Sequence, residues 1–187
     1  GGSMAHILLI ILSFITIPFL TLNANATELP HAPDGFTWQH VDEINAAFLL
    51  PDNWHYLKEK DGGTLGIFIT KENISMNGIF DTGITINIFP KSIPAPGQLK
   101  KLIERLSERH KVQTLTTSHK PFIKLSTEFN SIRETDNVSI RTLYIVLVNT
   151  YTRTSYLFIY ESPVSIWDEN WPIGNIIVNN YALEEKL

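Results

Sequence analysis

The sequence AAFLLPDNWHYLKEKDGGTLGIFITKENISMNGIFDTGITINIFP occupies residues 46–90 and has the pattern of several β-strands with the turns between them. Apolar residues recur at every second position in 65–69 and again in 84–88, which is the period of a strand in a sheet. Between two of these strands, Asp61-Gly62-Gly63 favours the left-handed conformations of a tight hairpin turn. Because turns of two or three residues join only antiparallel neighbours, the stretch predicts the start of an antiparallel sheet.

Strand patterns continue on both sides of this stretch. We expect strands at 36–41, 46–50, 55–60, 64–70, 83–89, 122–129, 138–149 and 155–161. Residues 143–148 are apolar at both strand parities, so both faces of the sheet should be covered there.

Two apolar layers are available to cover the predicted sheet. One is a helix over 98–111, in which Leu99, Leu102, Ile103 and Leu106 recur at helical spacing. The other is the last third of the chain, with apolar residues from 166 to 181. We therefore predict an α+β fold, a three-layer α/β/α sandwich with a central antiparallel sheet.

The N-terminal region predicts export. Residues 1–3 have the composition of a remnant of an expression tag, and residues 4–26 have the pattern of a signal peptide, with cleavage after Ala26. Their apolar run is shorter than the roughly 20 residues that span a bilayer, so a retained membrane anchor is the weaker alternative. Residues 27–35 should form an extended lead-in, and 36–187 a single α+β domain. The predicted location is periplasmic or secreted, with no integral membrane segment after cleavage.

Composition excludes several classes of function. The chain has 15 Lys and Arg against 19 Asp and Glu, and this mild acidity argues against a nucleic-acid partner. It has no cysteine, and therefore no disulfide framework and no thiol nucleophile. Motifs for a serine nucleophile, a zinc protease, a phosphate loop or a dinucleotide site are also missing. His40 and Asp42 would share a strand face, but no third ligand is in register, so surface placement is expected. No catalytic, cofactor-binding or metal-binding residue is predicted.

The order of elements resembles the PsbP-like superfamily. The resemblance is carried by Phe48, Pro51 and Trp54 in AFLLPDNW, by the phrase GIFITKEN, and by the strand from 83 to 90 that leads into a helix. The resemblance covers roughly residues 46–181. The superfamily includes bacterial exported proteins of unknown role, and the chain resembles these members. The resemblance implies a three-layer fold with an antiparallel sheet, and action as an accessory or binding module rather than as an enzyme.

Five residues are predicted to bind a partner. Lys101, Arg105 and Arg109 follow each other at four-residue spacing and would form a basic stripe on the helix, facing an acidic protein or an anionic surface. The alternative is a solvated helix face. Trp167 and Trp171 would stack one turn apart and could form a partner groove, with packing on the sheet as the alternative.

These features predict an exported, non-catalytic accessory or binding module that acts on a protein partner or a small ligand. The alternative is an exported hydrolase or metal-dependent enzyme whose site is dispersed along the sequence.

Overall fold

The computed structural model describes residues 29–75, 78–92, 101, 104–105, 114–119 and 122–184, with only the backbone of 114–119. His31–Leu187 is one compact unit of contacts, and Gly1–Pro30 is a separate unit of which only Leu29 and Pro30 are described. The following concerns the first of these units.

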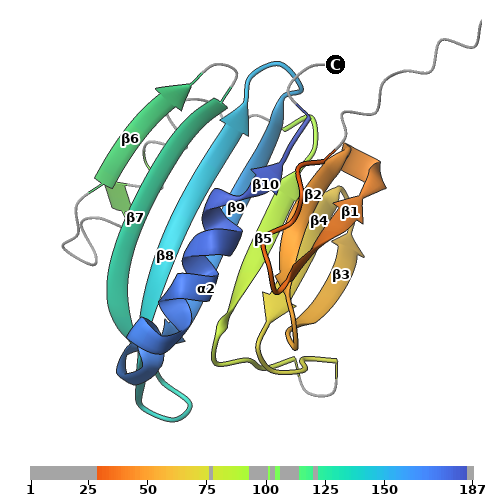
Figure 1. Ribbon diagram of the computed structural model, residues 1–187. Helices are drawn as coiled ribbons and strands as arrows, with labels where there is room; N and C mark the ends of the chain where they lie inside the picture. The colour runs from red at the N-terminus through yellow and green to blue at the C-terminus, as the bar shows by residue number, and fades with distance from the viewer. Residues whose placement is uncertain are drawn as a thin grey trace, which may run out of the picture. The chain divides into compact units, whose positions relative to one another are not determined.

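Two antiparallel sheets and the α-helix α2 are the elements of the fold whose bounds the structure describes (Figure 1). The smaller sheet has the order β1-β2-β10, with β1 Phe36–Val41, β2 Ala46–Pro51 and β10 Tyr181–Ala182. The larger sheet has seven strands in the order β3 His55–Asp61, β4 Thr64–Thr70, β5 Gly83–Phe89, β9 Thr154–Pro163, β8 Val138–Asn149, β7 Phe122–Arg133 and β6 Thr114–His119. Two short 3-10 helices, Asp42–Ile44 and Val164–Ile166, precede β2 and the helix α2 Trp167–Asn179.

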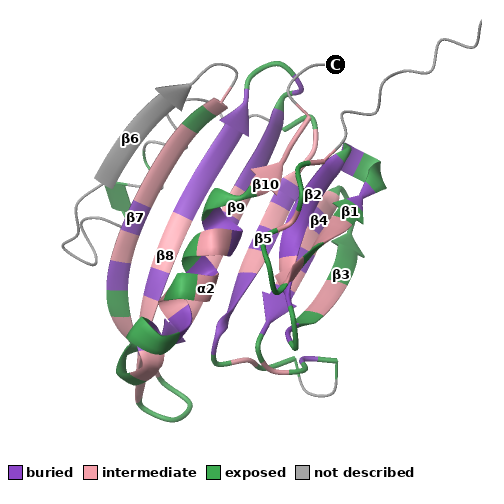
Figure 2. Cartoon of the chain, viewed as in Figure 1, coloured by how far each residue is buried: buried purple, intermediate pink, exposed green. Residues whose placement is uncertain are grey.

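The main core lies between the larger sheet and a layer made of α2 and the smaller sheet (Figures 1 and 2). Ile84, Ile86 and Ile88 of β5 lie opposite the aromatic residues of β9 at 160, 158 and 156, and all six side chains are almost fully buried. Phe158 meets Phe48 of the smaller sheet edge to face, and Tyr160 meets Trp167 of α2 in the same way. Because side chains alternate between the two faces of a strand, the isoleucines of β5 and the aromatic residues of β9 all point toward the layer made of α2 and the smaller sheet.

The second face of the larger sheet also buries apolar side chains. Val146 and Val148 are 3% and 4% exposed and form a separate cluster with Leu125 and Leu157. Ile145 and Leu147, which point to the main core, are equally buried. Tyr144 is half-buried and stacks on Phe129. The expectation that the middle of β8 is buried on both faces therefore agrees with the described residues, with Tyr144 less buried than its neighbours.

The fold is α+β with antiparallel pairing throughout, as expected, but one prediction about the sheet was wrong. The strands at 36–41 and 46–50 do not begin a single sheet. β2 pairs with β1 on one edge and with β10 on the other, whereas β3 pairs with β4 in the larger sheet. The strand β6 was not predicted. The helix predicted over 98–111 lies outside the described residues, except that Lys101, Glu104 and Arg105 are helical and exposed.

Candidate functional site

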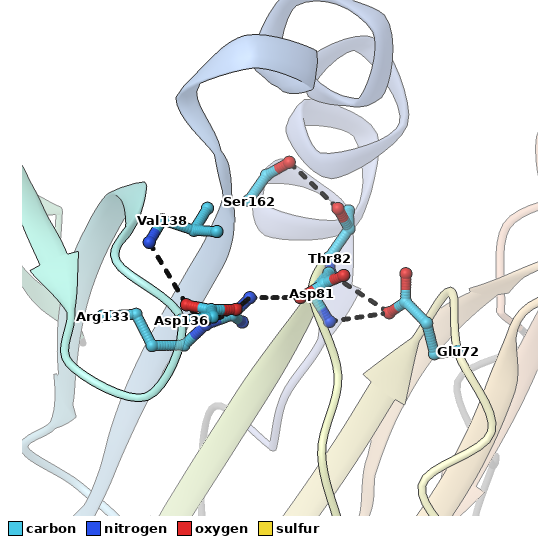
Figure 3. Close-up of polar contacts among 7 residues, drawn as sticks. All are labelled: Glu72, Asp81, Thr82, Arg133, Asp136, Val138 and Ser162. Atoms are coloured by element: carbon cyan, nitrogen blue, oxygen red, sulfur yellow. Dashed lines mark hydrogen bonds and ion pairs between the residues drawn. The ribbon is translucent and has the colours of Figure 1, made fainter.

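A polar network fixes the loop between β4 and β5 at one end of the larger sheet (Figure 3). The carboxylate of Glu72 accepts hydrogen bonds from the backbone N–H groups of Asp81 at 3.0 Å and Thr82 at 3.1 Å. The hydroxyl of Thr70, the last residue of β4, donates to the backbone carbonyl of Glu72 at 2.7 Å. Because charge-assisted bonds to backbone N–H groups are strong, the two ends of this loop are held together before β5 begins.

Arg133, the last residue of β7, connects this loop to the β7–β8 hairpin. Its Nη2 donates to Asp81 Oδ1 at 2.7 Å and to Asp136 Oδ2 at 2.5 Å, and its Nε donates to both oxygens of Asp136 at 2.9 and 3.0 Å. Asp136 also accepts the N–H of Val138 at 3.2 Å. The hydrogen bonds from Arg133 hold the pKa of Asp136 below its usual range, and the two aspartates raise the pKa of Arg133.

A buried hydroxyl pair completes the network. The side chains of Thr82 and Ser162 are fully buried and lie 3.0 Å apart, within hydrogen-bond distance. Thr82 lies just before β5 and Ser162 near the end of β9, so this bond joins the loop to the middle of the sheet. The loop is thus attached to β4, to β9 and to the β7–β8 hairpin.

Beside the network lies a depression of about 380 Å³, which we call the Arg133 depression. Its lining residues are Gly78, Ile79, Phe80, Asp81, Ser131, Arg133, Ile140 and Glu161. Ile79 is 65% exposed, the largest exposure among the large apolar side chains of the described chain. Ile79 lies with Phe80 and Ile140 in this lining, so apolar surface is gathered beside the charged groups of the depression.

Glu161 is the half-buried carboxyl group of the depression. It lies in β9, opposite Thr142 of β8, whose hydroxyl donates to it at 3.4 Å. Burial raises the pKa of Glu161, and the Thr142 hydroxyl and the charge of Arg133 oppose this shift. Its other cross-strand neighbour is Gly83, where an added Cβ would come within 2.7 Å of Thr70 Cγ2. The face next to Glu161 therefore has no side chain from β5 at that position.

The described members of the predicted partner-binding set are not among the lining residues of the Arg133 depression. Lys101 and Arg105 are exposed and helical, and Arg109 lies outside the described residues. Trp167 is 3% exposed and Trp171 is half-buried, and their rings stack at 5.2 Å. The tryptophans pack on Tyr160, whose neighbour Glu161 points to the opposite face of the sheet, so they do not join the Arg133 depression.

A cation–π contact adds to the tryptophan pair. The guanidinium of Arg141 lies 4.6 Å from the centroid of Trp167 and pairs with Glu128 of β7. This arrangement fixes the first turn of α2 against the sheet, and it is the packing alternative that the sequence left open for Trp167. Trp171 keeps part of its surface exposed.

Sequence reasoning missed the residues of the Arg133 depression. Asp81 and Arg133 are far apart in the sequence, and nothing in either local pattern indicates that they form a pair. Glu161 did carry a signal: it is the one charged residue in the strand TSYLFIYESP. A charge that interrupts an otherwise apolar strand indicates a polar site at that position.

Two further features are absent from the described residues. Nowhere in 29–75, 78–92 or 122–184 do three or more His, Asp or Glu side chains group closely enough to hold a metal ion. No helix in the described part of the chain has the length and hydrophobicity needed to cross a membrane.

Comparison with known proteins identifies the fold. No protein-family model matches the sequence, and no curated protein matches it. Among solved structures, the chain is similar to the solution structure of the cyanobacterial PsbP protein (CyanoP) from Synechocystis sp. PCC 6803. The two share 13% sequence identity with a TM-score of 0.54, over 82% of this chain and 95% of that chain. The predicted resemblance to the PsbP-like fold is thereby confirmed.

Proposed function

We propose that this chain of PsbP-like fold is an exported, non-catalytic accessory module that binds a protein partner through the Arg133 depression. The observation that carries the proposal is the exposed Ile79, placed beside a half-buried carboxyl group on a loop fixed at both ends. A single exposed apolar side chain would be ordinary, but Ile79 lies with Phe80 and Ile140 in one depression lined also by charged groups, and such a combination favours a binding role.

The hydrogen-bond network supports the proposal because it pre-organises the surface. Glu72 and Arg133 hold the loop before any partner arrives, so binding costs little of the conformational entropy that ordering a free loop would cost. Binding modules gain affinity in this way, while their contact area stays small.

The alternative of a hydrolase or metal-dependent enzyme is not favoured by the same residues. Arg133 is engaged by two aspartates, so these three groups satisfy one another and are not arranged as a nucleophile with its base. Ser131 also lines the depression, but no histidine is among its lining residues.

Export and the three-layer arrangement belong to the same proposal. The small-x-small ending of residues 4–26 supports cleavage after Ala26 and release of the domain into the periplasm or the medium. The burial of Val146 and Val148 supports a third layer on the second face of the sheet, and the helix predicted over 98–111 is its candidate. Purification from an exporting host should give a polypeptide that begins at Thr27 by intact-mass measurement, and recovery of uncleaved protein would contradict export.

The basic stripe and Trp171 are proposed as secondary contacts. Lys101 and Arg105 are exposed, which a role in steering an anionic partner requires. Trp171 is half-buried, so only its free edge could contribute to a partner groove.

Site-specific cross-linking tests the proposal. A benzoylphenylalanine at position 79 should give a discrete adduct with one partner in extracts of the organism that encodes the protein. The matched control is the same cross-linker at position 151, because Tyr151 is 49% exposed and lies at the opposite end of β8. Equal adducts at both positions, or none at position 79, would contradict partner binding at the depression.

A further inference from the structure

Among the described residues that line the Arg133 depression or pair with Arg133, carboxyl groups outnumber the cation. Arg133 supplies one positive charge, and both Asp81 and Asp136 are hydrogen-bonded to it. Glu161 adds a further carboxyl group that lines the depression. Because one guanidinium stands beside two aspartates and Glu161, the net charge of these lining and neighbouring groups disfavours an anionic ligand. A cationic ligand meets an excess of negative charge without displacing any bond.

The acceptor capacity of Glu161 points the same way. A carboxylate offers about four lone-pair positions, and the long bond from Thr142 uses one of them. A half-buried carboxylate gains most from a donor that brings its own positive charge, since the pair then offsets the cost of burial. Lysine and arginine side chains are the donors of this kind that a protein partner carries.

The size and lining of the depression can accommodate a long basic side chain. Its volume of about 380 Å³ lies near the lower end of the range for ligand sites, about 300–1,000 Å³. Ile79, Phe80 and Ile140 supply an apolar wall next to the carboxyl group. Long basic side chains have this composition, an aliphatic stem that packs on apolar surface and a charged end.

Resting on the proposed function, we infer that the Arg133 depression accepts a lysine or arginine side chain of the partner. Glu161 accepts its hydrogen bonds, and Ile79 and Phe80 pack against its aliphatic stem. The partner segment is therefore basic at one position and apolar beside it.

A peptide titration tests this inference on the full domain. The probe is the capped peptide acetyl-Leu-Arg-Leu-amide, titrated into nitrogen-15-labelled protein and followed by NMR. Its matched controls carry glutamine or glutamate in place of arginine. The arginine peptide should shift the signals of residues 79–81 and 161, the glutamine peptide should bind about tenfold more weakly, and the glutamate peptide should not bind.

Two protein variants localise the effect. Glu161→Gln keeps the size of the side chain and its bond with Thr142, and should reduce arginine-peptide affinity by about tenfold. Glu59→Gln makes the same charge change on the exposed strand β3, at the far edge of the same sheet, and should leave affinity within about twofold.

Equal binding of the arginine and glutamine peptides, or unchanged affinity in Glu161→Gln, would overturn the inference. Specific cross-linking at position 79 would then still stand, so that result would reject the basic ligand and retain the partner site. Loss of position-79 cross-linking together with arginine-selective binding at Glu161 would instead reject the protein partner.

Discussion

Gly174 of α2 has a packing role that its position in a helix conceals. A Cβ added there would lie 2.4 Å from Cζ of Tyr160, a ring that is itself fully buried. Alanine normally stabilises a helix by about 1 kcal/mol relative to glycine. Here we expect Gly174→Ala to lower the free energy of unfolding by roughly 1–3 kcal/mol, because the ring or the helix must move.

Chemical denaturation of Gly174→Ala and of Asn175→Ala measures this effect. Asn175 is the exposed neighbour, so its substitution changes helix propensity and removes an exposed hydrogen bond from Asn179, but does not affect the contact with Tyr160. A Gly174→Ala protein as stable as the parent would show that α2 is not packed closely on β9.

Glu161 predicts an unusual dependence of stability on pH. Because burial raises its pKa, the folded state binds a proton at this site more tightly than the unfolded state does. Glu161 therefore contributes to stability at pH values below 4.5, the ordinary pKa of a glutamate. This contribution is lost as the pH rises through the raised pKa of the folded state. Asp136 has the opposite sign, because its pKa is lowered: its contribution is present at neutral pH and is lost as pH falls.

Glu161→Gln should remove the first of these two effects. The stability of the variant relative to the parent should rise with pH across the window that begins at 4.5 and ends at the raised pKa. Urea denaturation at a series of pH values measures the difference. A difference that is flat with pH, or that falls, would contradict the burial of this carboxyl group.

At the scale of a single element, β8 is the strand that separates the two faces of the sheet. Leu147 points to the main core and Val146 to the second face, and both are nearly fully buried. Leu147→Ala should cost roughly 2–5 kcal/mol, and Val146→Ala should also destabilise, by a smaller amount because fewer carbons are removed. Equilibrium denaturation of both variants tests the third layer.

Val146→Ala is the informative variant for the third layer, because Val146 lies on the second face of the sheet. A change near 0.5 kcal/mol for Val146→Ala is the response of a surface position. Such a result, together with a large loss in Leu147→Ala, would reject the three-layer arrangement and retain the main core.

The strands with strong apolar alternation, such as 64–70 and 83–89, were predicted with the bounds that the structure has. The strand β6 was missed because TLTTSH has a single large apolar residue, and only its β-branched threonines favoured a strand. The separate sheet of β1, β2 and β10 was missed because a turn shows where a strand ends, but does not show which strand its residues pair with. The Arg133 depression depends on three segments that only the tertiary fold brings together.

At the scale of the molecule, charge is distributed unevenly. The sequence carries a net charge of −4, while Lys101 and Arg105 of the predicted basic stripe are exposed and helical. Reversing both to glutamate should change stability by no more than about 0.5 kcal/mol, because exposed positions tolerate substitution. It should weaken binding to vesicles that contain phosphatidylglycerol, and reduce the dependence of that binding on salt.

Vesicle co-sedimentation at several salt concentrations measures this effect. Lys60→Glu with Lys91→Glu is the control, since it makes the same charge change at two other exposed positions and leaves the ion pair between Lys58 and Glu43 intact. Parental binding by the Lys101 and Arg105 variant at low salt would show that the basic stripe is only a solvated helix face.

The smaller sheet has a consequence for the order in which the chain can fold. Tyr181 pairs with Phe48, so β10 can join β2 only after residues 181 and 182 have been synthesised and are free to move. A chain that emerges N-terminus first, from the ribosome or from a translocation pore, carries β2 with one edge open until the end. The pairing of β10 with β2 is thus a late, long-range step of folding. In a polypeptide cut before residue 181, this edge of the apolar strand β2 stays open and can pair with another chain.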